Sequence, residues 1–261
     1  MPQYIYNAYF IIVFCFGAVF GSFLNVCIYR LPEHQSIVTV PSHCMTCGYD
    51  LQWYDLIPII SYICLRGKCR KCGEKISPQY PVIESLNAIV WTLIFILHSE
   101  RIFSIYGVAE NLLLCGLFSA LLVLSVIDFR TYEIPEGVNI FIAVLGGIAT
   151  ALDFRNWLGH LLGLIIISVP LLIIYIVSKK RAMGGGDVKL MAAAGLFLGW
   201  KCALVAFMIG VIIAAIVHPI RMKVSKAGKV LALGPYLSLG IMISALFGEA
   251  IVAWYLSLMY I

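Results

Sequence analysis

Long apolar runs constrain this chain more than any other feature of its sequence. A helix of about 20 residues crosses the hydrocarbon core of a bilayer, and helices satisfy their own backbone hydrogen bonds there. Of the residues, 62% are hydrophobic and 12% charged, whereas soluble domains are about half apolar and about a quarter charged. We therefore predict an all-α integral membrane protein with about eight transmembrane helices, at residues 6–28, 82–98, 109–127, 137–152, 157–177, 187–199, 201–217 and 231–247.

Three segments of this pattern carry predictions of their own. The first run has no Lys or Arg before it and is longer than a signal-peptide core, so we expect a transmembrane helix rather than a cleaved signal. The runs at 187–199 and 201–217 are short and nearly contiguous, which predicts one broken helix or two tilted ones. The C-terminal piece IVAWYLSLMYI is predicted to be interfacial, with Trp254 and Tyr260 at the headgroups.

Basic residues divide unequally between the loops on the two sides. If the N-terminus is outside, only Arg101, Arg155 and Lys201 are external. The cytoplasmic loops then hold Arg30, Arg66, Lys68, Arg70, Lys71, Lys75, Arg130, Lys179, Lys180, Arg181, Lys189, Arg221, Lys223, Lys226 and Lys229. This bias follows the positive-inside rule and predicts that both termini are outside. The net charge of +5 thus reflects topology and gives no reason to expect a nucleic-acid partner.

Four cysteines in the loop 29–81 form two C-x-x-C pairs. They are Cys44, Cys47, Cys69 and Cys72, and the 21 residues between the pairs are one more than the usual range for a zinc-ribbon-like loop. A reducing cytoplasm disfavours disulfides, and Lys68, Arg70 and Lys71 favour thiolates. Four thiolates leave no position open for water, so the zinc is predicted to be structural. We therefore expect a first helix at 1–28, a small cytoplasmic zinc-binding domain at 29–81 and a polytopic membrane domain at 82–261.

Two carboxylates are placed unlike the others. Asp128 ends the third run, in LLVLSVIDFRTYEIP, and Asp187 opens the sixth, in MGGGDVKL. The topology puts both at the cytoplasmic face, at the same depth. An acidic group at a helix end inside a membrane bundle is costly, so each is a candidate functional residue.

If Asp128 and Asp187 meet, they share one proton, because the first charge opposes the second ionisation. One is then a general base that deprotonates water, and the other a general acid that protonates a scissile carbonyl oxygen as a gem-diol forms. Gly184, Gly185 and Gly186 lack a Cβ atom, so their backbone can approach an extended peptide and pair with it as an added strand.

Simpler interpretations exist for both segments. Asp128 beside Arg130 fits a surface ion pair, and glycine runs often serve turns or helix packing. GGGD is not a P-loop, since no Lys-Ser/Thr follows, and there is no Rossmann fingerprint. A transporter would carry its carboxylates near the midplane and show inverted repeats. A zinc-bearing membrane scaffold would recruit partners through 29–81 and leave the two aspartates without a task.

Four segments together resemble the type IV prepilin peptidases, bifunctional leader peptidases and N-methyltransferases within the G-x-G-D intramembrane aspartyl proteases. They are GSFLNVCIYRLP at 21–32, the cysteine-bearing stretch at 42–84, DFRTYEIP at 128–135 and GGGD at 184–187. The resemblance implies that Asp128 and Asp187 cleave the leader of a type IV prepilin or pseudopilin precursor at the cytoplasmic face of the bacterial cell membrane. It also implies N-methylation of the new N-terminus with S-adenosylmethionine, because the cysteine domain of the bifunctional form is present.

The methyl-donor site has no pattern of its own in the sequence. Asn25, Arg30 and Glu84 are polar groups where the membrane meets the zinc domain, and they are our candidates. The alternative is that Arg30 anchors a helix end and Asn25 packs against a neighbour.

The chain departs from the family pattern in two places. Met45 stands where the family often has proline, and Leu233-Gly234-Pro235-Tyr236 stands where it often has Phe-Gly-Pro. We expect neither departure to touch the carboxylates.

Overall fold

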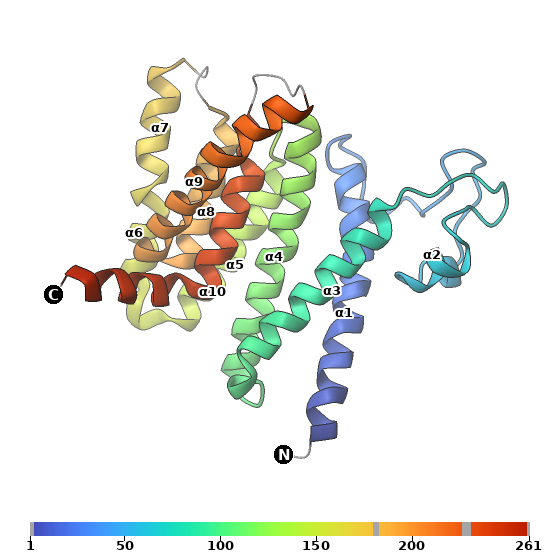
Figure 1. Ribbon diagram of the computed structural model, residues 1–261, viewed down its shortest axis with the longest axis horizontal. Coiled ribbons are helices and arrows are strands. Elements are labelled where there is room, and N and C mark those ends of the chain that lie inside the picture. The colour runs from blue at the N-terminus through green and yellow to red at the C-terminus, as the bar shows by residue number, and fades with distance from the viewer. Residues whose placement is uncertain (1–2, 180–182, 226–230, 260–261) are drawn as a thin grey trace. The chain divides into compact units, whose positions relative to one another are not determined.

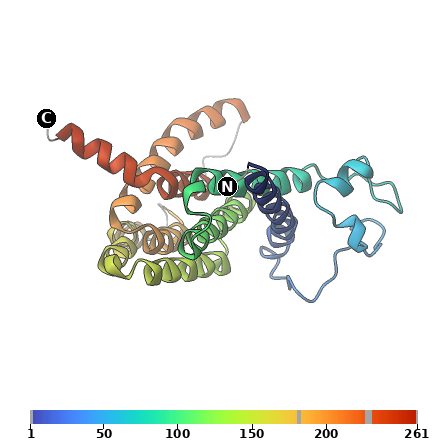
Figure 2. The same cartoon turned by 90° about the horizontal axis from the view of Figure 1, so that it is seen from below.

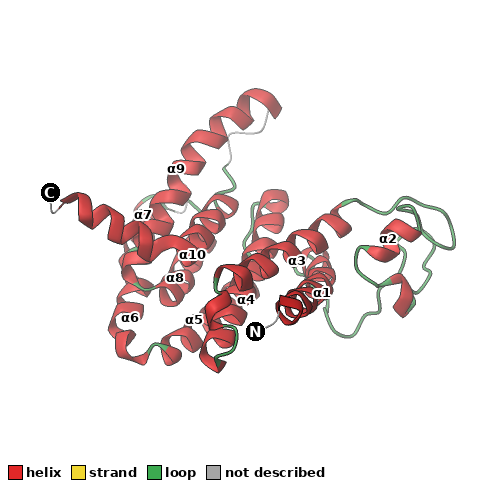
Figure 3. Cartoon of the chain, turned by 60° about the horizontal axis from the view of Figure 1, so that its bottom comes forward, coloured by secondary structure: helices red, strands yellow, loops and turns green. Residues whose placement is uncertain are grey.

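The computed structural model describes residues 3–179, 183–225 and 231–259 (Figure 1). Over these ranges the regular structure is helical, without a strand, and β-type pairing is limited to two isolated bridges (Figure 3). Lys180, Arg181, Lys226, Lys229 and Tyr260, which carry predictions above, lie outside the described residues. The chain forms two compact units, the N-terminal unit Met1–Cys115 and the C-terminal unit Gly116–Ile261.

Six helical segments are long and apolar enough to cross a membrane. They are Tyr6–Arg30, Gln79–Leu97, Ile105–Thr131, Phe154–Val177, Trp200–Lys223 and Gly234–Met259. The other two expected runs are shorter helices, α5 (Glu136–Leu152) with 17 residues and α8 (Gly185–Leu198) with 14. The prediction of an all-helical, multi-pass membrane protein is confirmed, and among the described residues its full-length candidate spans number six rather than eight.

Two questions about the last helices are answered by the backbone. Gly199, with φ 76°, separates α8 from α9 (Trp200–Ser225), so the sixth and seventh runs are two helices. With ψ at 166°, Gly199 has a backbone conformation that is essentially open only to glycine. The C-terminal apolar piece continues α10 (Gly234–Met259) as far as that helix is described, with Trp254 exposed.

The span Phe154–Val177 is interrupted between α6 (Trp157–Ile166) and α7 (Ser168–Val177). Pro170 explains the break, because proline has no N–H to donate to the carbonyl four residues earlier, which belongs to Ile166, and its ring crowds that carbonyl.

Helices α1 (Gln3–Arg30) and α3 (Gln79–Leu97) form the membrane part of the N-terminal unit, side by side (Figures 1 and 2). They meet at Gly17 and Gly21, spaced as in G-x-x-x-G contacts. A Cβ atom on Gly17 would lie 2.8 Å from Ala88 Cα, and one on Gly21 would lie 2.6 Å from Glu84 Cα. Asn87 Nδ2 donates to the Gly17 carbonyl at 2.8 Å across this contact. The helices approach this closely because neither glycine has a side chain.

Between α1 and α3 lies the irregular segment that holds the cysteines. Its regular elements are the 3-10 turn η1 (Trp53–Asp55) and the short helix α2 (Ile60–Cys64). A second 3-10 turn, η2 (Ser99–Arg101), leads from α3 towards α4 (Ile105–Thr131).

Helix α8 is the centre of the C-terminal unit and contacts α5, α6, α7, α9 and α10. Its Leu190, Met191 and Ala194 are fully buried. Against α6, a Cβ atom on Gly195 would lie 2.1 Å from the Gly163 carbonyl oxygen, so backbone packs on backbone there. A helix covered on most sides carries Asp187 into the interior of the unit.

The α1–α3 contact yields a test of packing. Gly21→Val should destabilise the protein by about 1–3 kcal/mol, the usual cost of overpacking, because the new Cβ atom meets backbone that cannot rotate away. The measurement is the midpoint of thermal unfolding in detergent. Gly147→Ala is the control, since a Cβ atom there meets nothing within 4 Å. Equal midpoints for Gly21→Val and the wild type would refute this close approach of the helices.

Candidate active site and metal centre

Asp128 and Asp187 are both buried in the C-terminal unit. Asp128 lies in the last turn of α4 and is 5% exposed, and Asp187 lies in the first turn of α8 and is 7% exposed. The two carboxyl groups are close enough for their charges to interact. The structure therefore brings the two residues together, while their catalytic role stays a prediction.

Each carboxylate is hydrogen-bonded to a backbone amide at the start of a helix. The Gly234 N–H, at the start of α10, donates to Asp128 Oδ2 at 2.9 Å. The N–H of Gly184, the N-cap residue of α8, donates to the Asp187 carboxylate. Helix N-termini carry partial positive charge and free N–H groups, so they stabilise buried anions.

The DFRTYEIP and GGGD segments are also held against each other. A Cβ atom on Gly186 would lie 2.8 Å from Ile134 Cβ. Asn139 Nδ2 donates to the Gly186 carbonyl at 3.5 Å, and Lys189 forms an ion pair with Glu136, the first residue of α5. These contacts join the segment that follows Asp128 to the segment that contains Asp187.

The three glycines before Asp187 have different surroundings. Gly186 is packed against Ile134, and a Cβ atom on Gly185 would lie 3.2 Å from the Tyr175 hydroxyl. At Gly184 a Cβ atom would meet nothing closer than 3.4 Å, which is ordinary contact. Packing is therefore sufficient reason for Gly186, and substrate binding by all three glycines stays a prediction.

Gly234 corrects one expectation. We expected the segment Leu233–Tyr236 to lie away from the carboxylates, and this is wrong, because the Gly234 amide bonds Asp128. A Cβ atom on Gly234 would lie 2.6 Å from Asp128 Oδ2 and 3.0 Å from Leu124 Cδ2. The available signal in the sequence was a Gly-Pro pair at the start of an apolar run, a usual way to begin a helix.

The four cysteine sulfurs of the N-terminal unit form one cluster. All of them lie within 4.8 Å of one another, and Cys44 Sγ is 3.8 Å from Cys72 Sγ. A tetrahedral site with Zn–S bonds of about 2.3 Å has sulfurs about 3.8 Å apart. The arrangement of Cys44, Cys47, Cys69 and Cys72 therefore fits one tetrahedral metal ion.

The two C-x-x-C segments are copies of one turn, 25 positions apart. In each, glycine follows the second cysteine with positive φ, 66° at Gly48 and 74° at Gly73, which side chains rarely adopt. The matching hydrogen bonds are Cys44 N–H to Tyr49 O at 2.9 Å, Cys69 N–H to Glu74 O at 2.7 Å, Gly48 N–H to Cys44 O at 2.9 Å and Gly73 N–H to Cys69 O at 2.9 Å. The bridges His43–Asp50 and Lys68–Lys75 close the two turns alike.

The pKa values of the Cys44 and Cys72 thiols are shifted in opposite directions. The amides of Cys47 and Thr46 lower the pKa of the Cys44 thiol to about 6. The Glu74 amide acts in the same direction on Cys72, but burial and the neighbouring cysteines outweigh it and raise the pKa of that thiol to about 12. The Cys72 thiol is thus disfavoured as a thiolate by its surroundings, and a bound dication is what would hold it in that form.

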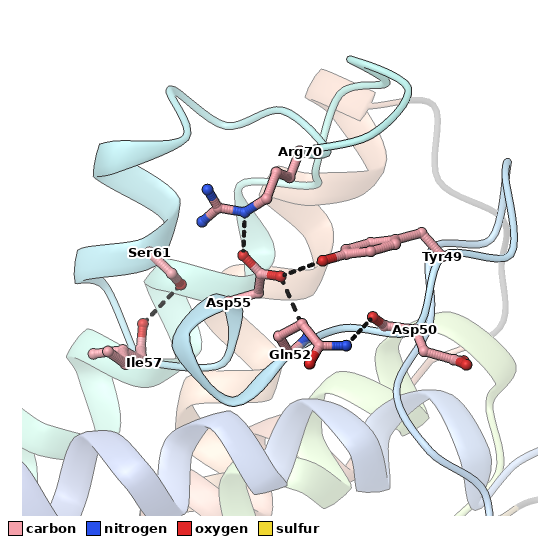
Figure 4. Close-up of polar contacts among 7 residues, drawn as sticks. All are labelled: Tyr49, Asp50, Gln52, Asp55, Ile57, Ser61 and Arg70. Carbon is pink, nitrogen blue, oxygen red and sulfur yellow. Dashed lines mark hydrogen bonds and ion pairs between the residues drawn. The ribbon is translucent and has the colours of Figure 1, made fainter.

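Asp55 braces both cysteine turns. Its side chain is 1% exposed. It accepts hydrogen bonds from Arg70 Nε at 2.8 Å, from the Tyr49 hydroxyl at 3.3 Å and from the backbone N–H of Gln52 at 3.3 Å (Figure 4). Tyr49 follows the first pair of cysteines and Arg70 lies inside the second, so one buried carboxylate ties the two turns together. We did not identify Asp55 from the sequence, which carries no signal for it beyond an acid between the pairs.

Asn25, Arg30 and Glu84 line one cavity of about 530 Å³ in the N-terminal unit. The rings of Tyr29 and Tyr80, which line the same cavity, stack with centroids 5.6 Å apart and planes at 18°. The structure thus brings the three candidates for the methyl-donor site to one space of the size that small-molecule sites have.

Each of the three candidates also has a structural partner. Asn25 Nδ2 donates to the Tyr80 carbonyl at 3.2 Å, and Glu84 Oε2 accepts the Ile59 N–H at 2.7 Å. The Arg30 guanidinium donates to three carbonyls of the following loop, those of Ser36 at 3.1 Å, Val40 at 2.8 Å and Pro41 at 3.3 Å. These bonds support the anchoring role for Arg30 and leave methyl-donor binding untested.

Comparison with known families places most of the chain. Residues 15–98 match the bacterial peptidase A24 N-terminal domain, and residues 115–218 match the type IV leader peptidase family. None of the solved structures compared with the chain matches it significantly.

Several curated relatives share the name prepilin leader peptidase/N-methyltransferase. The one from Bacillus subtilis is 30% identical over 95% of this chain and 98% of its own length. The one from Vibrio cholerae is 34% identical over 82% of this chain and 86% of its own length. The one from Myxococcus xanthus is 35% identical over 78% of this chain, which spans 60% of that relative. These matches agree with the two cysteine turns and with the buried pair of aspartates. The chain therefore belongs to the type IV leader peptidase family, with the bacterial A24 N-terminal domain.

Proposed function

We propose that Asp128 and Asp187 are the catalytic pair with which this chain cleaves the leader peptides of type IV prepilin or pseudopilin precursors. One observation carries the proposal. Two carboxylates, both more than nine-tenths buried and each bonded to the amide of a helix start, lie close enough for their charges to interact. The family is a leader peptidase family, and its curated relatives bear the name of such an enzyme.

The chemistry follows from a pair that shares one proton. The ionised carboxylate takes a proton from water as the water oxygen bonds to the scissile carbonyl carbon, and the protonated carboxyl gives its proton to the carbonyl oxygen. As the gem-diol breaks its C–N bond, one of its hydroxyl groups returns a proton to the ionised carboxylate and the protonated carboxyl gives its proton to the leaving amine, which restores the pair with one proton. No covalent enzyme intermediate is needed.

Neither rival function accounts for this arrangement. A transporter needs its carboxylates near the middle of its spans, whereas Asp128 lies three residues before the end of α4 and Asp187 in the first turn of α8. A zinc-bearing scaffold has no use for a buried acidic pair, whose desolvation is costly.

We also propose that the chain N-methylates the trimmed precursor, as the names of the relatives say of those proteins. The new N-terminal amine, in its unprotonated form, would attack the methyl carbon of S-adenosylmethionine, and the C–S bond would break so that the sulfonium leaves as a neutral thioether. The cavity lined by Asn25, Arg30 and Glu84 is our candidate for this co-substrate. The stacked rings of Tyr29 and Tyr80 offer aromatic surface of the kind that favours both a flat base and a cation.

The metal proposed for Cys44, Cys47, Cys69 and Cys72 is a structural zinc ion. It would hold the two turns together in a segment too small to build much of a core. The division of the chain into 1–28, 29–81 and 82–261 stays a prediction.

The family and the candidate spans make this a multi-pass membrane protein of bacterial type, with the lipid bilayer as its surroundings. We propose that the zinc-binding segment and the aspartate pair are on the cytoplasmic side, because the basic residues gather in the loops on that side. Nothing in the charge distribution calls for a nucleic-acid partner.

Replacing either aspartate separates the two activities. Asp128→Asn and Asp187→Asn should each lower leader cleavage by about two to four orders of magnitude, the scale of general acid–base catalysis. The double variant should be little worse than either, because groups that act as a unit are not additive. Cleavage and methylation of an already trimmed pilin are measured separately on one preparation.

The control for this experiment is Asp153→Asn, in the same unit, whose carboxylate faces His160 and is half exposed. It should cleave normally, and all four variants, the double variant included, should still methylate. Retained cleavage in Asp187→Asn would end the aspartyl-protease proposal, and joint loss of both activities would mean that the two sites overlap.

Metal binding is tested at Cys69. Cys69→Ser should lose about one zinc ion per chain and open the segment 29–81 to proteolysis, because three ligands hold the metal poorly. Cys64→Ser, an exposed cysteine of the same segment outside the cluster, should keep its zinc. Elemental analysis of freshly purified, reduced protein gives the answer, and a metal-free wild type would remove the claim.

Orientation is tested at the two ends of one candidate span, Phe154–Val177. In a variant that keeps only the four clustered cysteines, a new cysteine at Arg155 should react with an impermeant thiol reagent in intact cells. One at Lys179 should react only after permeabilisation. The reverse pattern would place the aspartate pair on the outer face.

A further inference from the structure

In the first turn of α10, one backbone N–H group is bonded to a side chain from a distant part of the sequence. The opening N–H groups of a helix find no partner within it. Here Pro235 has no N–H, and Tyr236 N–H turns back to the Leu233 carbonyl at 3.1 Å. The remaining amide is that of Gly234, and it donates to Asp128 Oδ2, 106 residues away in the sequence.

The space at Gly234 is closed to any side chain. A Cβ atom there would stand 2.6 Å from Asp128 Oδ2 and 3.1 Å from Asp128 Cγ. It would also stand 3.0 Å from Leu124 Cδ2, a side chain that is fully buried one turn before Asp128 on α4. The cheapest way to relieve such a clash is to move the carboxylate, which breaks its bond to the amide.

We propose that Gly234 is a positioning residue of the peptidase centre: its amide fixes Oδ2 of Asp128, so that Oδ1 is the oxygen that acts on the water or shares the proton. The proposal rests on the proposed role of Asp128 in cleavage. A carboxylate on a short side chain can turn about its last bond, and a single donor at one oxygen removes that freedom. The centre then has three parts, the end of α4, the start of α8 and the start of α10.

Pro235 has no backbone N–H, and this absence helps to leave the Gly234 amide as the donor to Asp128. Because it carries no N–H, it cannot offer the carboxylate a second, displaced donor, and its fixed φ suits the first turn of a helix. A residue before proline is pushed away from helical backbone, and this restriction is weakest for glycine. The Gly-Pro pair therefore presents one amide in one place.

The test is Gly234→Ala, with cleavage kinetics measured on a purified precursor. A displacement of about 1 Å at a catalytic group can cost about 100-fold in rate. We expect kcat for cleavage to fall about 10- to 100-fold, with KM for the precursor little changed and with methylation of a trimmed pilin intact. Gly147→Ala, at a position with nothing within 4 Å of the new atom, should match the wild type in all three.

A second variant removes the donor without adding an atom. Replacing the Leu233–Gly234 amide by an ester deletes the N–H and keeps the shape of the turn, so it should lower kcat for cleavage about tenfold or more, as loss of a bond to a charged group does. It also decides the matter if Gly234→Ala fails to fold. Wild-type kcat in the ester variant would overturn the proposal, as would equal losses of cleavage and methylation in folded Gly234→Ala.

The Asp128→Asn variant distinguishes a failure of the role proposed for Gly234 from a failure of the proposed peptidase function. If Asp128→Asn cleaves normally, the proposed function itself fails. If it is inactive while Gly234→Ala and the ester variant turn over like the wild type, only the role of Gly234 fails.

Discussion

A buried charge needs a partner, and in the C-terminal unit the partners we see are backbone amides at helix starts. Asp128 takes the Gly234 amide and Asp187 the Gly184 amide. Lysine or arginine in these places would favour the ionised form of both carboxylates, and the proposed pair would then hold no proton to share. An amide supplies a fixed partial charge, cannot lose its proton and costs no side-chain entropy. Two acids can therefore stay buried without a cationic partner.

This constraint explains features of the fold that hydropathy alone leaves open. Helix α8 is only 14 residues long and is buried by its neighbours. A helix packed inside the unit need not cross the whole bilayer, provided that the unpaired N–H groups of its first turn find hydrogen-bond acceptors. At the start of α8, the Asp187 carboxylate is the acceptor for the Gly184 amide. The contact at Gly163 and Gly195 lets α6 approach it to backbone distance. The short length of α8 thus goes together with the buried position of Asp187 in its first turn.

Much of the architecture could be predicted from the sequence because it rests on local properties. Apolar length locates the helices, and two C-x-x-C-G segments locate the cysteine cluster, since each depends on residues adjacent in the chain. The meeting of Asp128 and Asp187 could be expected because both close or open an apolar run at the same face. Gly234 could not be, because its partner is 106 residues away and its contribution comes from a backbone N–H that every residue but proline has. Asp55 escaped notice for a similar reason, since burial and three donors mark it only once the turns are folded.

Glycine shows most clearly where sequence reasoning reaches its limit in this chain. Gly186 and Gly234 both admit no Cβ atom, and both lie next to an aspartate or its hydrogen-bond partner. At Gly186 the blocked space holds an isoleucine side chain, Ile134, so the missing atom serves packing. At Gly234 it holds the Asp128 carboxylate, so the missing atom leaves room for the hydrogen bond between the Gly234 amide and Oδ2. A glycine in a signature motif is thus not by that fact a binding residue, and one outside it can be part of the centre. What separates the two cases is the identity of the atom that fills the space.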